Sequence, residues 1–306
     1  MNVTVVLLFI FMYLANFGSI FTEVKYGRVA NGFFELSLSS VIRCVVALAF
    51  FYVMSGFKLY TNKAVLLYSL GFAATVLSSQ YLGLIVYKYV TVLEKGIALG
   101  AIPLAFSCVF GAAAFGEAVN AVSVLRVVLS MAALVSYMLY KRASDKSAEQ
   151  SVTDADRRKA GLLILAVLVI TTCFGTVVNK YFALLPMSKE YSNSFCFYTN
   201  VYCLIASAVF FVIAAKGKPN TVKNGIMSFG IKNCVLMIIN TVCSNIGSLT
   251  SLLILAYDVP LNIYYTLTAA LGVIIQVAVS LITEKKKIPI VPVALALAAA
   301  VVVLFS

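Results

Sequence analysis

Residues 141–184 read KRASDKSAEQSVTDADRRKAGLLILAVLVITTCFGTVVNKYFAL, and the change of composition at residue 161 decides the fold class. Residues 141–160 are polar throughout, whereas residues 161–184 are almost entirely apolar. A helix rises about 1.5 Å per residue, so about 20 apolar residues cross the ~30 Å hydrocarbon layer of a bilayer. We therefore predict a transmembrane helix over 161–184.

The same contrast runs along the whole chain of 306 residues, of which 62% are hydrophobic and only 11% charged. A mean hydropathy of +1.03 excludes a soluble fold. Backbone polar groups find no partner in hydrocarbon, so a spanning chain must be helical or a closed barrel. The apolar stretches lack the alternation of barrel strands. The sequence thus predicts an all-α, multi-pass protein of the cell membrane.

Ten apolar segments are long enough to span the bilayer. They cover residues 2–21, 31–55, 64–86, 96–115, 119–140, 161–184, 192–215, 230–256, 260–283 and 288–305. The polar linker 141–160 divides them into two repeats of five, 1–140 and 161–306. An odd number of helices reverses the direction of the second repeat, which is the inverted arrangement of many secondary transporters. The pairs Gly116-Glu117 and Thr283-Glu284, at the ends of the fourth and ninth segments, echo one another.

The net charge of +12 is distributed in a way that predicts orientation rather than nucleic-acid binding. Most of the 23 basic residues lie singly or in short runs in the loops that follow the odd-numbered segments. Cytoplasmic loops carry such an excess of Lys and Arg, so both termini are expected outside. The four basic residues within helices are Arg43, Arg126, Lys180 and Lys232; the two lysines are expected to extend toward the membrane surface.

Several kinds of chemistry lack their residues in this sequence. Histidine is absent, which removes HExxH metal sites and Ser-His-Asp triads. All seven cysteines fall inside apolar segments, where packing residues are expected rather than disulfides or metal ligands. There is no phosphate-binding loop for ATP. We therefore predict no catalytic residue, metal or cofactor, although an intramembrane enzyme with paired acids at membrane depth is a competing class.

Short motifs carry a family resemblance. The third to fifth segments contain, in order, Tyr81, Tyr87, Tyr89, Pro103, Gly116-Glu117, Ser130, Ala132 and Ala133. The second half repeats part of this order as Ala256-Tyr257, Tyr264-Tyr265 and Glu284. In these features the sequence resembles the drug/metabolite transporter superfamily, in particular its ten-helix EamA-type members. It departs from them at Arg126, where a glycine is usual, and at Ala270, where a second proline is expected.

This resemblance implies a secondary transporter that moves a small organic metabolite or drug-like solute by alternating access. It also implies that the fifth and tenth helices are peripheral and face lipid or a second copy in a homodimer. Members of the family usually keep both termini in the cytoplasm, which is opposite to the charge bias. A non-transporting receptor or assembly subunit is the other competing class, and it would pack its polar residues against helices.

Polar side chains on three segments are the candidate substrate contacts. In the eighth segment Asn233, Asn240, Ser244, Ser248 and Ser251 share one helical face. This face is either a cavity wall or a row of interhelical hydrogen bonds. We select from it Asn240, Ser244 and Ser248, and add Tyr198, Asn200 and Tyr265 from the seventh and ninth segments. The FYTN run at 197–200 faintly resembles a motif of nucleotide-sugar transporters.

Arg43 is the deepest charge of the chain, near the middle of the second segment. An arginine at this depth costs about 2.5–3.5 kcal/mol on insertion scales, so a partner is expected. A carboxylate or phosphate of the substrate would serve, and then the protein would exchange anionic solutes such as nucleotide sugars or sugar phosphates. Backbone carbonyls are the structural alternative. Glu35 either couples transport to protons or points to the cytoplasmic surface.

Overall fold

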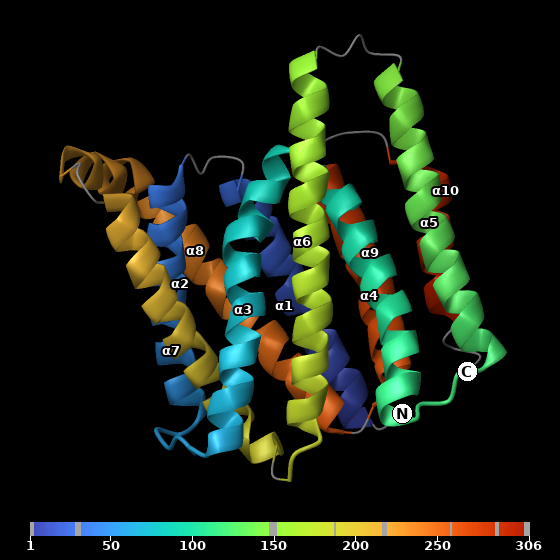
Figure 1. Ribbon diagram of the computed structural model, residues 1–306, viewed down its shortest axis with the longest axis horizontal. Helices are drawn as coiled ribbons and strands as arrows, with labels where there is room; N and C mark the ends of the chain where they lie inside the picture. Colours follow the sequence, from blue (N-terminus) through green and yellow to red (C-terminus); the bar gives the residue numbers. More distant parts are fainter. Residues whose placement is uncertain are drawn as a thin grey trace. The chain divides into compact units, whose positions relative to one another are not determined.

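The computed structural model describes residues 3–27, 32–146, 152–186, 188–215, 219–257, 259–284 and 288–302. Within these ranges every regular element is a helix, and the prediction of an all-helical chain is confirmed (Figure 1). Nine of the helices in the described ranges are long and apolar enough to cross a membrane, and a shorter apolar helix follows them. The chain is thus a multi-pass membrane protein by length and composition.

The chain divides into two compact units. Unit 1 comprises Met1–Ile85 and Val177–Tyr257, and unit 2 comprises Val86–Thr176 and Asp258–Ser306. Each unit therefore takes helices from both predicted repeats. A repeat concerns the order and direction of helices, whereas a unit concerns packing, so the two divisions need not coincide.

Unit 1 is built from five long helices and the end of a sixth. They are α1 (Val3–Gly27), α2 (Phe33–Met54), α3 (Lys63–Ile85), α7 (Ser188–Ala215), α8 (Pro219–Ala256) and the last residues of α6 (Val152–Ala183). Its apolar core includes Phe51, Phe182 and Phe195, with the last two rings stacked at 4.2 Å between centroids. Gly230 interrupts α8 with a φ of 63°, in the left-handed region that glycine adopts without steric cost.

Unit 2 contains the remaining helices. They are the 3₁₀ turn η1 (Val86–Lys88), α4 (Val92–Phe115), α5 (Ala121–Lys146), most of α6, α9 (Leu261–Thr283) and α10 (Ile290–Val301). Its core joins Leu93 and Ile97 of α4 with Ala133 of α5, Val273 of α9 and Ala296 of α10.

Several helix ends differ from the predicted spans. The first helix continues from residue 21 to Gly27, and α5 and α6 extend into the polar linker at Lys146 and Val152. Hydropathy indicates which residues lie in the hydrocarbon layer. A helix can continue through polar residues beyond that layer. The predicted span 288–305 corresponds to α10, although residues 303–306 lie outside the described part of the chain.

Two helix pairs position the polar residues discussed below. In unit 1, α2 and α7 are antiparallel: the ring of Phe34 lies 5.1 Å from that of Phe211, and Asn193 near the other end donates to the carbonyl of Met54 at 3.1 Å. In unit 2, α4 and α9 are antiparallel as well, because the start of each helix lies beside the end of the other.

Candidate functional site

Arg43 occupies the middle of α2 in unit 1 and is buried, with 6% of its surface exposed. Glu23 of α1, which is 8% exposed, is the acid whose charge acts most strongly on the guanidinium. Tyr26 lies one turn farther along α1, and its hydroxyl donates to the backbone carbonyl of Glu35 at 3.2 Å. A charged and polar centre therefore lies inside otherwise apolar helices.

The Arg43 guanidinium is only partly satisfied. Its Nη1 nitrogen is buried and makes no hydrogen bond to any residue that the structure describes. A buried charged donor without an acceptor is costly, so this nitrogen favours an anionic or carbonyl acceptor at this position. The guanidinium fork suits carboxylates and phosphates, which it can bind through two parallel hydrogen bonds.

A second polar cluster joins α2, α3 and α7 within unit 1. The Ser40 hydroxyl donates to Oε1 of Gln80 at 2.5 Å and shares a 2.6 Å hydrogen bond with the Ser207 hydroxyl. Cys44 lies 3.8 Å from the same Gln80 oxygen. All four side chains are buried. Their mutual hydrogen bonds hold three helices together at membrane depth.

Asn240 of α8 bonds to α1. Its Nδ2 donates to the backbone carbonyl of Ser19 at 2.8 Å and lies 3.2 Å from the Thr22 hydroxyl oxygen. The two helices approach closely, since a Cβ at Gly18 would lie 2.8 Å from the sulfur of Cys243. Asn240 thus makes interhelical hydrogen bonds, which is the structural alternative to a cavity wall for this face of α8. Its role in substrate binding stays a prediction.

The other predicted contacts of unit 1 have different surroundings. Ser244 and Ser248 are half-buried on the same helix as Asn240. Asn200 is buried and donates to the Cys196 carbonyl at 2.8 Å, within its own helix. Tyr198 of α7 shares a hydrogen bond with the hydroxyl of Thr61, which lies between α2 and α3. Glu35 is half-buried in the first turn of α2. None of these contacts tests substrate binding or proton coupling.

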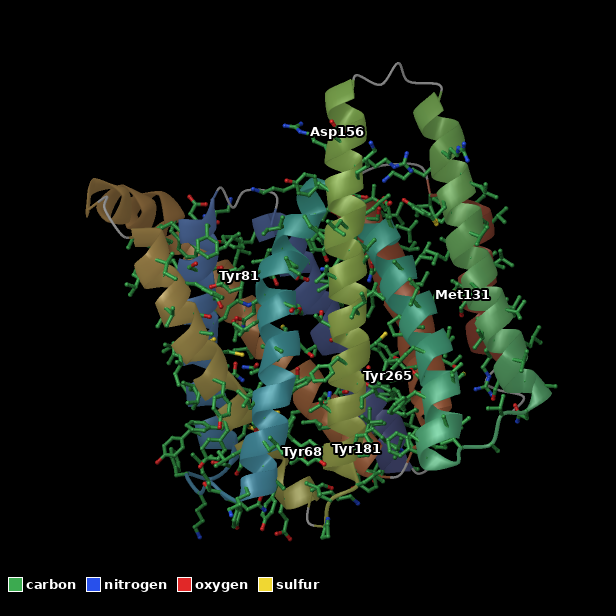
Figure 2. The ribbon with its side chains drawn as sticks, in the orientation of Figure 1. Tyr68, Tyr81, Met131, Asp156, Tyr181 and Tyr265 are labelled. Carbon is green, nitrogen blue, oxygen red and sulfur yellow. The ribbon has the colours of Figure 1, made fainter. Side chains whose placement is uncertain are left out.

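Tyr265 belongs to unit 2, unlike the rest of the predicted set. It lies on α9, where its hydroxyl shares a hydrogen bond with Thr176 of α6 (Figure 2). Its ring meets that of Tyr264 edge to face, with 4.9 Å between centroids. The other candidate residues all belong to unit 1, where their printed contacts are to different partners, and Tyr265 belongs to unit 2.

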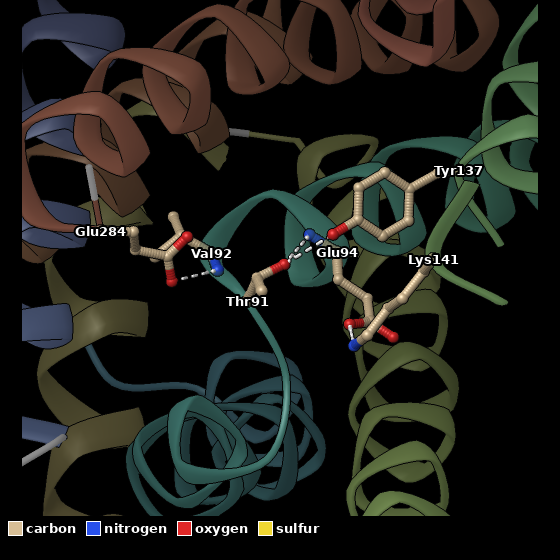
Figure 3. A network of polar contacts seen from close by, with 6 residues as sticks. All are labelled: Thr91, Val92, Glu94, Tyr137, Lys141 and Glu284. Atoms are coloured by element: carbon tan, nitrogen blue, oxygen red, sulfur yellow. Dashed lines mark hydrogen bonds and ion pairs between the residues drawn. The ribbon is translucent and has the colours of Figure 1, made fainter. Parts of the chain in front are cut away.

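Two acids form hydrogen bonds that connect α4 and α9 in unit 2. Glu117, which follows α4, accepts a hydrogen bond through Oε1 from the backbone N–H of Leu261 at 2.9 Å, where α9 begins. Glu284, which follows α9, lies 3.3 Å through Oε1 from the N–H of Val92, where α4 begins (Figure 3). The first N–H groups of a helix lack intrahelical partners, so carboxylates are favoured there.

The start of α4 carries a further polar network. Thr91 is the N-cap, accepting from the N–H of Glu94 at 3.1 Å, and its hydroxyl shares a 2.7 Å hydrogen bond with Tyr137 of α5. The Glu94 carboxylate in turn pairs with Lys141 (Figure 3). These contacts connect the N-terminus of α4 to the C-terminal part of α5.

Sequence reasoning missed Glu23, Gln80 and Ser207. Glu23 was assigned to a loop because the first span was ended at residue 21. Ser207 is a single polar residue among apolar ones, whereas Gln80 ends the short polar run Ser78-Ser79-Gln80, and these were the available signals. The prediction that Lys180 extends toward the membrane surface is wrong, because its side chain is packed in unit 1 with 4% exposure, whereas Lys232 is exposed as expected.

Comparisons with known proteins inform the fold alone. No protein-family model matches the sequence, and no curated protein matches it. Chains of solved structures do match. One of them, known from a crystal structure, is 15% identical, with a TM-score of 0.57 over 100% of this chain and 99% of that one. A likeness at this identity shows a shared helical architecture over the full length of both chains.

Proposed function

We propose that the chain is a secondary transporter of the EamA type that moves a small organic metabolite or drug-like solute by alternating access. The observation that supports this most is the Arg43 centre: a charged residue at the middle of a membrane helix, with a buried guanidinium nitrogen that no described residue accepts from. Ionisable residues at membrane depth are expensive, and they commonly mark solute pathways.

The inverted five-helix repeats are part of this proposal. Ser40 and Ser207, which share a hydrogen bond in unit 1, are 167 residues apart. Glu117 and Glu284, which have matching roles in unit 2, are separated by the same number of residues. A single offset that relates partners in both units is expected if residues 1–140 and 161–306 are copies in opposite directions. Such repeats allow a carrier to alternate between two mirror-related states.

A carrier for anionic or phosphorylated solutes is the second candidate, and Arg43 is the observation that favours it. Bidentate binding of a carboxylate or phosphate would satisfy the open donor. Glu23 already supplies some negative charge, so a substrate with a single anionic group matches this centre better than a polyanion does. In either version Glu35 is the candidate for proton coupling.

Transport by purified protein in proteoliposomes tests both versions. A panel of labelled neutral and anionic metabolites identifies what is taken up, and Arg43→Gln and Arg43→Lys are then compared with Lys58→Gln, which removes an exposed charge. If Arg43 binds an anionic group, both Arg43 variants lose uptake at least tenfold while Lys58→Gln keeps it. Unchanged anion uptake by Arg43→Gln eliminates the second candidate, and lack of uptake for the entire panel favours a receptor or assembly subunit.

A further inference from the structure

A groove of about 450 Å³ lies between α5 and α6 of unit 2. Its walls are the side chains of Val135, Met138, Leu139, Arg142, Arg158 and Leu162. The volume falls within the roughly 300–1,000 Å³ of small-ligand sites. It is separate from the Arg43 centre, which belongs to unit 1, so an occupant here would have its own role.

The groove is amphipathic along its length. On α5, Leu139 and Arg142 are three residues apart and therefore share a face of the helix. On α6, Arg158 and Leu162 are four residues apart and share a face in the same way. Both arginines lie next to the linker that joins the helices, at the end of α5 and near the start of α6. The apolar wall lies deeper along both helices, and Val135, Met138 and Leu139 are each more than half exposed.

Among the side chains that the structure describes at this end of the unit, two acids pair with lysines. Glu94 pairs with Lys141, and Asp156 pairs with Lys159 at 3.5 Å. Neither acid lines the groove, and the charged residues among its lining side chains are Arg142 and Arg158. Two guanidinium groups above an apolar wall match a molecule with a phosphate at one end and hydrocarbon at the other.

We infer that this groove binds an anionic phospholipid, with the phosphate between Arg142 and Arg158 and the upper acyl chain against Met138 and Leu139. Arginine favours phosphate because its planar donors form paired hydrogen bonds. The linker beside the groove belongs to the loops that the charge bias assigns to the cytoplasm, and anionic lipids are concentrated in the cytoplasmic leaflet. Basic pockets between membrane helices on that side are suited to such headgroups.

Native mass spectrometry of the full chain in detergent tests the inference, with phosphatidylglycerol and phosphatidylcholine as probes. The double variant R142Q/R158Q should bind phosphatidylglycerol about 30-fold more weakly, if each arginine contributes on the order of 1 kcal/mol at a membrane surface. The matched control is R157Q, which removes an exposed charge from the same helix outside the groove. Phosphatidylcholine binding should be weaker at the start and unchanged by all of these variants.

Two further arms separate a lipid from a soluble anion and from a folding defect. Leu139→Gln keeps both charges and should weaken phosphatidylglycerol binding, whereas inorganic phosphate at millimolar concentration should not displace the lipid. Elution as a single monodisperse peak establishes that each variant is folded. Equal lipid binding by R142Q/R158Q and R157Q, or displacement by inorganic phosphate, overturns the proposal.

Discussion

Glu117 and Glu284 each receive a backbone N–H at the start of the helix that the other one follows. Glu117 accepts from Leu261 at the start of α9, and Glu284 faces the N–H of Val92 at the start of α4. The two contacts close the antiparallel α4–α9 pair at both of its ends. Each replaces an unpaired helical donor with a charge-assisted hydrogen bond, which is worth more than a neutral one.

Removal of either carboxylate should loosen one end of this pair. We expect Glu117→Ala and Glu284→Ala each to lower the free energy of unfolding by about 0.5–2 kcal/mol, the range for loss of a helix cap. The measurement is thermal or denaturant unfolding in detergent. Asp156→Ala, which removes an exposed acid from α6, is the control and should change stability by less than about 0.5 kcal/mol.

The double variant Glu117→Ala/Glu284→Ala tests whether the two acids act at separate ends of the α4–α9 pair. The two sites lie at opposite ends of α4, a helix of 24 residues that is about 36 Å long. Sites that far apart contribute additively to stability within about 0.5 kcal/mol. A much larger coupling would mean that the two acids do not act at separate ends.

In unit 2 a close approach requires glycine at position 161, whereas the space at position 272 is open. A Cβ on Gly161 of α6 would collide with the Cβ of Tyr89, which is held near the backbone and cannot rotate away. A Cβ on Gly272 of α9 would meet no atom within 4 Å. We expect Gly161→Ala to cost about 1–3 kcal/mol through overpacking, whereas Gly272→Ala should gain up to ~1 kcal/mol of helix propensity. Unfolding midpoints measured side by side test the opposite signs.

The position of most helices was predictable from the sequence, because the length of an apolar run reflects the thickness of the bilayer. The ends of α1 and α5 were not, since both helices continue through polar residues. The error at the end of α1 affected the site. Because Glu23 was placed in a loop, its electrostatic interaction with Arg43 was missed.

Pairings between helices were the least predictable feature. The sequence placed Glu117 and Glu284 at the ends of the fourth and ninth segments, but the N–H groups that they bind depend on how α4 packs on α9. The Ser40–Gln80–Ser207 cluster joins three helices, and no local pattern connects such distant residues. Periodicity indicates which face of α8 is polar, whereas only packing reveals that Asn240 bonds to α1.

Glu23 and Arg43 should be coupled in stability. Replacement of either residue by a neutral one leaves the other charge buried with less compensation, which destabilises a protein more than loss of both charges does. We expect Glu23→Gln and Arg43→Gln each to be destabilising and the double variant to be less so than their sum, with a coupling of about 0.5–3 kcal/mol. Additive effects in unfolding experiments would show that the two side chains act independently.

Asn240→Ala separates the two roles that its helical face can have. Loss of the bonds to Ser19 and Thr22 should lower stability by about 0.6–2 kcal/mol, the range for interhelical hydrogen bonds in membranes. If Asn240 acts only in packing, the apparent KM for a transported solute stays unchanged while the unfolding temperature falls. A raised KM at unchanged stability would assign it to the substrate instead.

The orientation of the chain can be tested without the termini. Lys58 lies between α2 and α3, and Lys159 lies near the start of α6 within the strongly basic linker region. The charge bias places Lys159 in the cytoplasm and Lys58 outside, since excess Lys and Arg stay on the cytoplasmic side. The seven native cysteines all lie within helices and are buried or half-buried, so a single added cysteine gives a distinguishable signal. In intact cells a membrane-impermeant thiol reagent should label Lys58→Cys and spare Lys159→Cys, and the reverse pattern would show that the chain has the orientation usual for the family it resembles.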